Sequence, residues 1–442
     1  MTSWTPATRR DRVIAKIVGF LARAFYRRID VHWTEPARSG PVLSVANHFG
    51  GLADAIVVLD TLPRHPRIIA RDVIWKIPLV GILMNWVGAL PVHKSEDRGA
   101  MSANDQMFSS CYEGLRQGDL LHIFPEGVTR NEPSIARVKT GAARIVLGAR
   151  ASGVGGITIQ PLGIHYEDKA ALRSRIVVQG GRTIDVDGFA APLEVDGRVV
   201  TADDRDAVAA LTALIDAELR RAAPDYEDWG EARDLTEAAE ITVRAELESD
   251  DLVVPIALRD RLANVLAELP APHRAEIRSA VADYRADLDG VGLTDAEFTR
   301  QLTAGRFAVR LTGQILLGVL LLPFAVVGAG INLIPFLIVK AVGLLRVAPS
   351  VMSTIKPIVA MVAFGITWGI QLWRIGEEWG VGGVAAGVVL LPVYAAAVVF
   401  VFDRAVMMWR LFRRWRATHK SHGITDELAA HRAAVFEATV AA

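Results

Sequence analysis

A long apolar region between Leu311 and Phe402 constrains the fold of this chain more than any other feature. A helix that crosses the hydrocarbon core of a bilayer needs about 20 mostly apolar residues. With 51% hydrophobic residues and ten tryptophans in 442 residues, the chain is expected to have a membrane partner. Four apolar runs occur in the region, the first two of half to full span length and the last two long enough to cross, at Leu311–Val327, Ile331–Leu345, Ile355–Trp373 and Val381–Phe402.

Basic residues flank this region on both sides and indicate its orientation. Arg300, Arg306 and Arg310 precede the first run, and six more follow the last one: Arg404, Arg410, Arg413, Arg414, Arg416 and Lys420. Because cytoplasmic flanks carry the excess of Lys and Arg, both ends should be cytoplasmic, which requires an even number of crossings. Two full spans plus a re-entrant hairpin meet this requirement, and so do four spans. Lys340 inside the second run favours the re-entrant form, and a buried hairpin of a soluble protein is the alternative.

Composition and periodicity divide the rest of the chain. The first segment is a basic amphipathic helix that could lie on an anionic bilayer or pack as an ordinary surface helix. A later segment, rich in Ala, Leu and charged residues, predicts several helices with solvated faces. We therefore expect a basic N-terminal helix, an α/β domain, a helical segment, a membrane domain and a basic cytoplasmic tail, at residues 1–29, 30–199, 200–305, 306–403 and 404–442.

The α/β domain is predicted from short apolar strands that alternate with helical segments, a pattern typical of a mixed sheet flanked by helices. The expected helices lie at Leu52–Leu62, Met101–Gln117 and Thr140–Ala151. The expected strands lie at Pro41–Val45, Arg67–Ala70, Ala89–Val92, Leu120–Pro125, Ile157–Gly163 and Arg175–Gln179.

One stretch of this domain carries groups suited to proton transfer. The sequence V-A-N-H-F-G-G-L-A-D places His48 just beyond a strand and Asp54 where a helical pattern begins. An imidazole can take a proton from a hydroxyl at neutral pH, and a carboxylate beside it can fix its tautomer. This is the base-and-orienter part of a Ser-His-Asp triad without the serine, so the hydroxyl could belong to a substrate. The spacing by itself also fits a polar loop and a helix cap.

Three further blocks follow this stretch along the chain. Leu120–Arg130 reads L-L-H-I-F-P-E-G-V-T-R, a strand that runs into a Pro-Glu-Gly turn and then a cation. Gly88–Lys94 reads G-A-L-P-V-H-K, and Ile159–Tyr166 reads I-Q-P-L-G-I-H-Y. Together the four blocks resemble the glycerolipid acyltransferase family, whose members acylate glycerol phosphate and its lyso-derivatives in phospholipid biosynthesis. The resemblance is confined to the α/β domain.

The chain departs from the family pattern in three places. Five residues separate His48 from Asp54 where four are usual, a spacing that resembles the branch containing fungal glycerol-3-phosphate and dihydroxyacetone-phosphate acyltransferases. Val128 is inserted before Thr129 and Arg130 in the third block. In the second block a lysine, Lys94, replaces the usual arginine, which keeps the charge but loses the bidentate fork.

The resemblance implies a direct transfer of an acyl group from acyl-CoA or acyl-carrier protein, with His48 as base and Asp54 as its orienter. The acceptor phosphate would be held by Arg130, from its position in the family motif, with Lys94 and Lys139 as partners.

Two motif residues have less direct roles. A glutamate beside a phosphate would repel it, so Glu126 is expected to contact a glycerol hydroxyl or to hold an arginine. Gly127 permits close approach of the backbone. The long spacing favours glycerol-3-phosphate or dihydroxyacetone phosphate as acceptor, and lysophosphatidate (1-acylglycerol-3-phosphate) is the alternative. A non-catalytic lipid-binding membrane scaffold with a degenerate acyltransferase domain is the alternative from another class.

Other functions lack support in the sequence. Equal numbers of basic and acidic residues, 49 of each, argue against a nucleic-acid-binding protein. No metal, nucleotide or nicotinamide motif is present, so the expected co-substrate is the thioester alone. Cys111, the single cysteine, is expected in the core, as are His122 and His165. We expect an integral membrane protein, in the plasma membrane if its source is bacterial, whose partners are membrane lipids and whose catalytic domain and termini are cytoplasmic.

Overall fold

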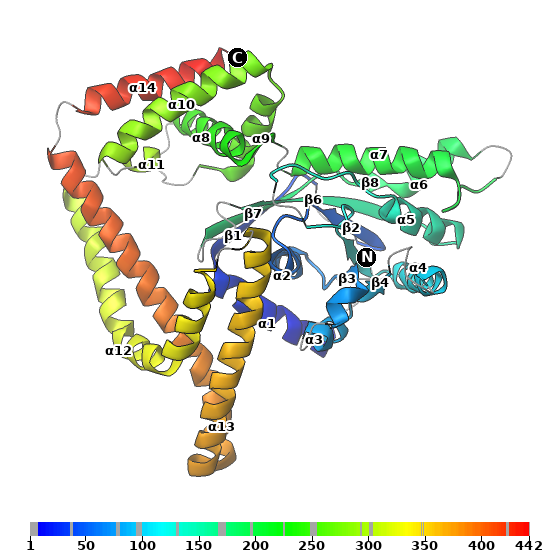
Figure 1. The fold of residues 1–442 in the computed structure, drawn as a ribbon, viewed down its shortest axis with the longest axis horizontal. Helices are drawn as coiled ribbons and strands as arrows, with labels where there is room; N and C mark the ends of the chain where they lie inside the picture. Colours follow the sequence, from blue (N-terminus) through cyan, green and yellow to red (C-terminus); the bar gives the residue numbers. More distant parts are fainter. Residues whose placement is uncertain are drawn as a thin grey trace. The chain divides into compact units, whose positions relative to one another are not determined.

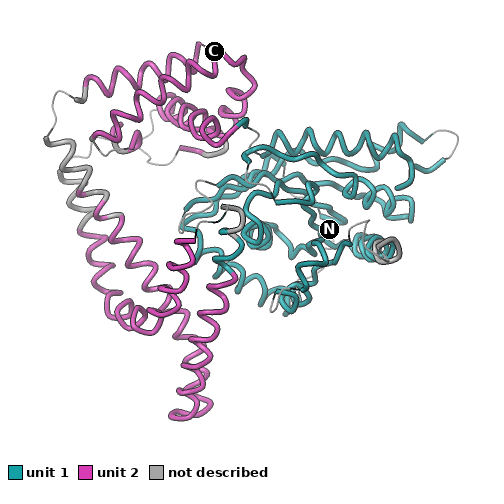
Figure 2. Tube along the Cα trace, in the orientation of Figure 1, with its two compact units in different colours: residues 1–227, 347–357 teal, residues 228–346, 358–442 magenta. Residues whose placement is uncertain are grey.

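The computed structural model describes residues 8–35, 39–76, 80–93, 100–129, 132–166, 174–194, 198–223, 226–247, 254–291, 294–299, 304–345, 347, 349–420 and 424–441. The chain divides into two compact units, drawn in different colours in Figure 2. Unit 1 comprises residues 1–227 and 347–357, and unit 2 comprises residues 228–346 and 358–442.

Unit 1 is built around a mixed sheet with the strand order β1-β7-β6-β2-β5-β3-β4, and β8 pairs with β6 (Figure 1). Strand β2 is parallel to β5 and β6, β3 is parallel to β4 and β5, and β7 is antiparallel to β6. The predicted fold class is confirmed, and the expected strands are present with ends displaced by a few residues. The strands are β1 (Tyr26–Trp33), β2 (Val42–Ala46), β3 (Arg67–Arg71), β4 (Leu90–Val92), β5 (Leu120–Ile123), β6 (Thr158–Tyr166), β7 (Ser174–Gly180) and β8 (Ile184–Asp185).

Strand β1 was not predicted, and its first residues had been assigned to the N-terminal helical segment. Helix α1 (Arg9–Phe25) begins at a capping box, in which the Thr8 side chain accepts the Asp11 N–H and the Asp11 carboxylate accepts the Thr8 N–H. At Tyr26 the backbone becomes extended and pairs with β7 in parallel. Most residues of this edge strand are half-buried or exposed, so the strand lacks the apolar pattern that marks an internal one.

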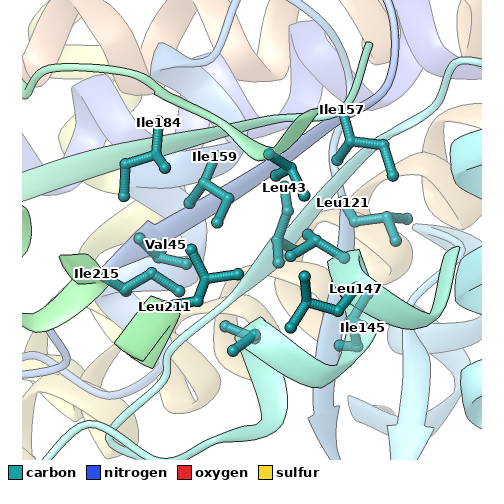
Figure 3. Packing of buried hydrophobic residues seen from close by; sticks show 14 of the residues in the cluster. Leu43, Val45, Leu121, Ile145, Leu147, Ile157, Ile159, Ile184, Leu211 and Ile215 are labelled. Carbon is teal, nitrogen blue, oxygen red and sulfur yellow. The ribbon is translucent and has the colours of Figure 1, made fainter. Parts of the chain in front are cut away.

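Helices cover both faces of the sheet. On one face α4 (Ala100–Arg116), α5 (Gly141–Ala151) and α7 (Arg205–Ala222) enclose a core to which Leu43 of β2 and Leu121 of β5 contribute (Figure 3). On the other face the second core includes Val42 of β2 and Val57 of α2 (Leu52–Thr61). Burying one such side chain fully stabilises the fold by about 1.5–3 kcal/mol. The remaining elements of unit 1 are short: α3 (Val80–Trp86), α6 (Val186–Ala190), η1 (Asp72–Lys76) and η2 (Ala191–Leu193).

Helix α7 packs with unit 1, whereas composition had suggested that the α/β domain ends at residue 199. Asp204 caps the start of the helix by accepting the N–H of Ala207. Leu211, Ile215 and Leu219 are fully buried in the same core as β2 and β5. The boundary between the units therefore lies at residue 227.

Unit 2 contains a helical bundle formed by segments on both sides of the apolar region. Its helices are α8 (Trp229–Glu246), α9 (Ile256–Ala267), α10 (Ala271–Val291), α11 (Asp295–Phe298) and α14 (Ile424–Val440). Helix α14 packs on α8 and α10. The nearly buried carboxylate of Asp295 binds Arg432 of α14 and Arg244 of α8, each at 2.8 Å. His431 binds Asp287 at 2.5 Å, and this hydrogen bond raises the pKa of the imidazole.

The apolar region forms two long helices, α12 (Ala304–Val342) and α13 (Pro349–Lys420). Within the described residues, Thr312–Val342 and Thr354–Val406 are long and apolar enough to cross a membrane. Many of their large apolar side chains are exposed, for example Leu320 at 68% and Val381 at 88%. Helix α13 is interrupted at Gly380, which has φ +62° and ψ −159°, and the chain reverses direction there (Figure 1).

Candidate functional site

Those of the expected site residues that the structure describes lie at one edge of the sheet in unit 1. His48 follows β2, and Glu126 follows β5, so both lie where parallel strands end. Arg71 ends β3, which is parallel to β5, and Tyr166 ends β6, which is parallel to β2. Because loops at the carboxyl edge of parallel strands converge, side chains far apart in sequence come together here.

His48 and Asp54 form a hydrogen-bonded pair. The Nδ1 atom of His48 lies 2.8 Å from Oδ2 of Asp54, which is in the first turn of α2 and fully buried. The same oxygen accepts the backbone N–H of Gly50 at 2.8 Å, and the other carboxylate oxygen accepts the Tyr166 hydroxyl at 2.5 Å. Three donors thus surround a buried carboxylate, whose desolvation would otherwise be costly. The geometry matches the predicted base-and-orienter pair.

Asn47 fixes the loop that carries His48 to the neighbouring strand. Its side-chain amide donates to the carbonyl of Ile164 at 3.0 Å, and its side-chain oxygen accepts the Ile164 N–H at 2.7 Å. Asn47 is fully buried. Just beyond the end of β2, the Asn47 side chain thus pairs with the backbone of β6 as a further β2 residue would. This pairing fixes the direction in which the loop leaves the sheet.

Glu126 joins two loops. One carboxylate oxygen accepts the N–H of His48 and the other accepts the N–H of Ala136, each at 2.8 Å. The side chain is 1% exposed, and burial raises its pKa, although the two backbone donors oppose that rise. The contact with a glycerol hydroxyl or an arginine that the sequence suggested stays a prediction, since Arg130 lies outside the described residues. The carboxylate sets the position of the His48 backbone.

Aromatic contacts support one face of the His48 ring. Phe124 stacks on it, with ring centroids 4.1 Å apart and an interplanar angle of 17°. His122 meets Phe124 edge-on at 4.6 Å and contacts Ser44 Oγ through Nδ1 at 2.7 Å. His122 is fully buried, and burial lowers its pKa to about 3. It is therefore a neutral core residue, as the sequence suggested. His165 is also buried in the core, where its ring bonds the carbonyl of Ala222.

Two cations accompany the site within the described residues. Lys139 is exposed and lies over Gly127, where a Cβ atom would come within 2.7 Å of its Nζ. Gly127 has φ +64°, in the left-handed region that favours glycine. Arg71 has a buried Nε atom without a hydrogen-bond partner. Arg130 and Lys94, the other two predicted cations, lie outside the described residues.

Several residues at this site were missed by sequence reasoning. Tyr166 was read only as the end of a motif block, and Arg71 only as the residue after a strand. Thr354, at the start of α13, accepts the N–H of Leu52 at 3.3 Å and so touches the first turn of α2. Because these residues are separated from His48 in sequence, no local pattern indicated them. For Arg71 one signal could have been used, namely a cation at the end of a parallel strand.

Comparisons with known proteins match the part of the chain that carries this site. Residues 28–165 match the acyltransferase family. Glycerol-3-phosphate O-acyltransferase 2 of Saccharomyces cerevisiae is 28% identical over 215 residues, which cover 47% of this chain and 27% of the yeast protein. The chloroplastic 1-acyl-sn-glycerol-3-phosphate acyltransferase LPAT1 of Arabidopsis thaliana is 26% identical over 152 residues, which cover 34% of this chain and 40% of the plant protein. The chain thus spans less than half of the length of each of these two relatives.

A solved structure is also similar over part of the chain. The crystal structure of the 1-acyl-sn-glycerophosphate acyltransferase PlsC from Thermotoga maritima aligns with a TM-score of 0.34 and 15% identity, and the alignment covers 48% of this chain and 80% of that one. The family match includes the segment that carries His48, Asp54 and Glu126. Residues 28–165 therefore form an acyltransferase domain of the glycerolipid acyltransferase family.

Proposed function

We propose that this protein transfers a fatty acyl group from an acyl thioester, of coenzyme A or acyl-carrier protein, to a hydroxyl of glycerol-3-phosphate or dihydroxyacetone phosphate. The observation that carries the proposal is the pairing of His48 with the buried Asp54 at the sheet edge of an acyltransferase domain. The long His–Asp spacing and the yeast relative support a glycerol-phosphate acceptor. The plant relatives support lysophosphatidate as the second candidate.

The geometry suits direct transfer. Because the Nδ1 proton of His48 is donated to Asp54, the lone pair lies on Nε2 and can take the proton of the acceptor hydroxyl. The hydroxyl oxygen then forms a bond to the thioester carbonyl carbon, and the carbonyl oxygen becomes an oxyanion. When this intermediate collapses, the carbon–sulfur bond breaks, and the proton on His48 passes to the leaving thiolate. No acyl-enzyme is needed, and the thioester is the only co-substrate.

Cations at the edge of the sheet would hold the acceptor phosphate. Arg71 is suited to this role because its buried Nε lacks a partner, and a phosphate would satisfy it. Lys139 adds a mobile positive charge beside Gly127. Arg130 and Lys94 remain proposed ligands from their positions in the family motifs. Glu126 acts indirectly, by holding the His48 backbone.

We further propose that the apolar helices insert the enzyme into a membrane from the cytoplasmic side. The helical bundle of unit 2 contains helices that precede the apolar region and one, α14, that follows it. Both ends of the apolar region must therefore lie on the same side of a bilayer, so the number of crossings is even. The basic flanks place that side in the cytoplasm.

Side-chain contacts favour a re-entrant α12 and a full-span hairpin in α13. Along α12, Gln314 bonds Arg404 and Phe324 packs on Tyr394, whereas Asn332 bonds Trp368 and Phe336 packs on Phe364. The first half of α12 thus runs against the arm after Gly380 and the second half against the arm before it. Since those arms are antiparallel, α12 folds back on itself, as Figure 1 shows.

The depth of the two hairpins differs. Trp368 and Tyr394 are 12 and 14 residues from Gly380, so α12 turns about 20 Å short of the tip of α13 at 1.5 Å per residue. That distance is most of a bilayer core of about 30 Å. Trp379 is 74% exposed at the tip, where an interfacial tryptophan is expected. These depths support a topology in which α13 crosses the membrane twice and α12 does not cross it.

This topology can be measured with cysteine labelling, since Cys111 is the only cysteine and is buried. In a Cys111→Ala background, Glu378→Cys at the tip should react with a membrane-impermeant maleimide added from outside the cell. Gly330→Cys, at the turn of α12, should remain unlabelled from outside. Labelling of both from outside would support four crossings, and labelling of neither would show that α13 does not cross.

The activity is tested with detergent-purified protein and palmitoyl-CoA, with glycerol-3-phosphate or lysophosphatidate as acceptor. We expect turnover with glycerol-3-phosphate, its loss in His48→Ala, and no loss in His273→Ala, which removes an exposed histidine of α10. Turnover with lysophosphatidate alone would establish the second candidate. If acyl-carrier-protein donors and other lyso-lipids also fail while lipids still bind, the scaffold alternative is correct.

A further inference from the structure

Two tyrosines stand behind the His48–Asp54 pair and have no part in the proton transfer described above. Tyr166, the last residue of β6, donates its hydroxyl to Oδ1 of Asp54 at 2.5 Å. Tyr26, the first residue of β1, is 6% exposed and shares a side-chain hydrogen bond with Tyr166. Their ring centroids are 6.2 Å apart. We propose that Tyr166 and Tyr26 are positioning residues, which hold Asp54 in its orientation toward His48 through a relay of two hydroxyl groups.

The direction of the hydrogen bonds follows from the number of protons. A tyrosine hydroxyl has one proton, and Tyr166 donates it to the carboxylate of Asp54. Tyr26 must therefore donate its own proton to the Tyr166 oxygen. Burial and the negative charge of Asp54 raise the pKa of Tyr166 well above its usual value, so this donor stays protonated over the working pH range.

The sheet brings these groups together from distant parts of the sequence. Strand β7 lies between β1 and β6, with Ser174 paired to Tyr26 and Ile176 paired to Tyr166. The two tyrosines thus flank the same end of β7. Strand β6 continues four residues beyond Leu162, the partner of the last residue of β2, and so reaches Asp54.

The contacts of Asp54 explain why such a relay is needed. Oδ2 is oriented by His48 and by the N–H of Gly50, both within the same short loop. Oδ1 receives its hydrogen bond from Tyr166, which belongs to the sheet rather than to the loop. A buried carboxylate with an unsatisfied oxygen would rotate or take a proton. Tyr166 therefore fixes the loop's carboxylate to the rigid sheet.

Gly50 makes room for this contact. A Cβ atom at Gly50 would lie 2.6 Å from the Tyr166 hydroxyl and 2.7 Å from Oδ1 of Asp54. The hydrogen bond between these two groups passes directly beside the backbone of the loop. The first glycine of the V-A-N-H-F-G-G stretch thus leaves space for a tyrosine more than a hundred residues away in sequence.

The test compares Tyr166→Phe, Tyr26→Phe and the control Tyr112→Phe, which removes a hydroxyl on α4 away from the site. This inference rests on the proposed acyl transfer. We expect kcat to fall about 10- to 100-fold in Tyr166→Phe, as for loss of a hydrogen bond to a charged group, and about 2- to 10-fold in Tyr26→Phe. KM for acceptor and donor should stay within about twofold, and Tyr112→Phe should resemble the wild type.

A second readout does not depend on activity. The Nδ1 proton of His48, bonded to a carboxylate, should give a downfield proton NMR resonance that Asp54→Asn abolishes. We expect this resonance to shift in Tyr166→Phe, to shift less in Tyr26→Phe and to be unchanged in Tyr112→Phe. An inactive wild type that shows these shifts would overturn the acyl-transfer proposal and leave the relay established. An unchanged resonance in folded Tyr166→Phe and Tyr26→Phe, or unchanged kcat in an active enzyme, would overturn the relay.

Discussion

Replacement of Gly50 by alanine is the sharpest perturbation of the site that leaves every polar group in place. The added Cβ atom would lie 2.6 Å from the Tyr166 hydroxyl and 2.7 Å from Oδ1 of Asp54. The backbone at Gly50 has no left-handed φ, so the substitution introduces no backbone strain. The effect therefore comes from the close approach alone.

The size of the effect follows from these distances. Ordinary contacts begin at 3.4 Å, so the two oxygens together with the loop must move by about 0.7–0.8 Å. Asp54 is fully buried in α2 and Tyr166 ends a central strand, so neither yields easily. Overpacking of this kind costs about 1–3 kcal/mol of stability. A displacement of nearly 1 Å at the group that orients the base should lower kcat by about 100-fold.

The assay is acyl transfer from palmitoyl-CoA under saturating acceptor, alongside thermal unfolding in detergent. The control is Gly155→Ala, since a Cβ atom at that exposed glycine meets nothing closer than 4.0 Å. It should retain wild-type turnover and stability. If Gly50→Ala retained more than about a third of wild-type kcat, the reasoning that Asp54 is held by the Tyr166 contact would be refuted.

Three more predictions concern neighbouring groups. Arg71→Ala should raise KM for a phosphate-bearing acceptor about 10- to 100-fold, with little change in KM for the donor. The control Arg116→Ala, which removes an exposed arginine of α4, should leave both KM values unchanged. Equal changes of the acceptor KM in the two variants would exclude phosphate binding by Arg71. Glu126→Gln should lower kcat at least about tenfold, because an amide can accept from only one of the two backbone N–H groups and opposes the other; full activity would show that the clamp is dispensable. His122 has a folded-state pKa of about 3, below its usual 6.5, so the unfolded state binds the proton first, and stability present above pH 6.5 is lost as the pH falls toward 3. Between pH 7.5 and 5.5, the free energy of unfolding of His122→Phe should therefore fall by about 1.4 kcal/mol less than that of the wild type. The Tm of the variant should accordingly drop by about 3–6 °C less than that of the wild type. Parallel curves of Tm against pH would contradict this.

Local patterns in the sequence were enough to find the central pair. His48 and Asp54 are six residues apart across one turn, and the apolar strand before them and the helical pattern after them are both short-range signals. The ends of internal strands were predicted to within a few residues for the same reason. Strand β1 was missed because an edge strand with half-exposed side chains carries little alternation.

The partners of that pair required the fold. Asn47 binds Ile164, Glu126 binds the backbone of His48, and Tyr166 binds Asp54, and each contact joins residues more than 70 positions apart. Strand order decides these contacts, because β6 and β5 flank β2 in space while lying far from it in sequence. Glu126 shows the consequence most clearly, since no local pattern indicates that its carboxylate accepts the backbone N–H groups of both His48 and Ala136.

The apolar region divides in the same way. The sequence by itself determined that residues 311–402 are too apolar for an ordinary surface, because hydropathy is a property of each side chain and adds along the chain. Which arm of α13 each half of α12 contacts depends on packing between residues far apart in sequence, and only the tertiary structure decided that. Composition determines that a segment is too apolar for exposure to water. Packing between distant helices determines which segments contact one another, and strand order determines which residues of the acyltransferase domain meet at one edge.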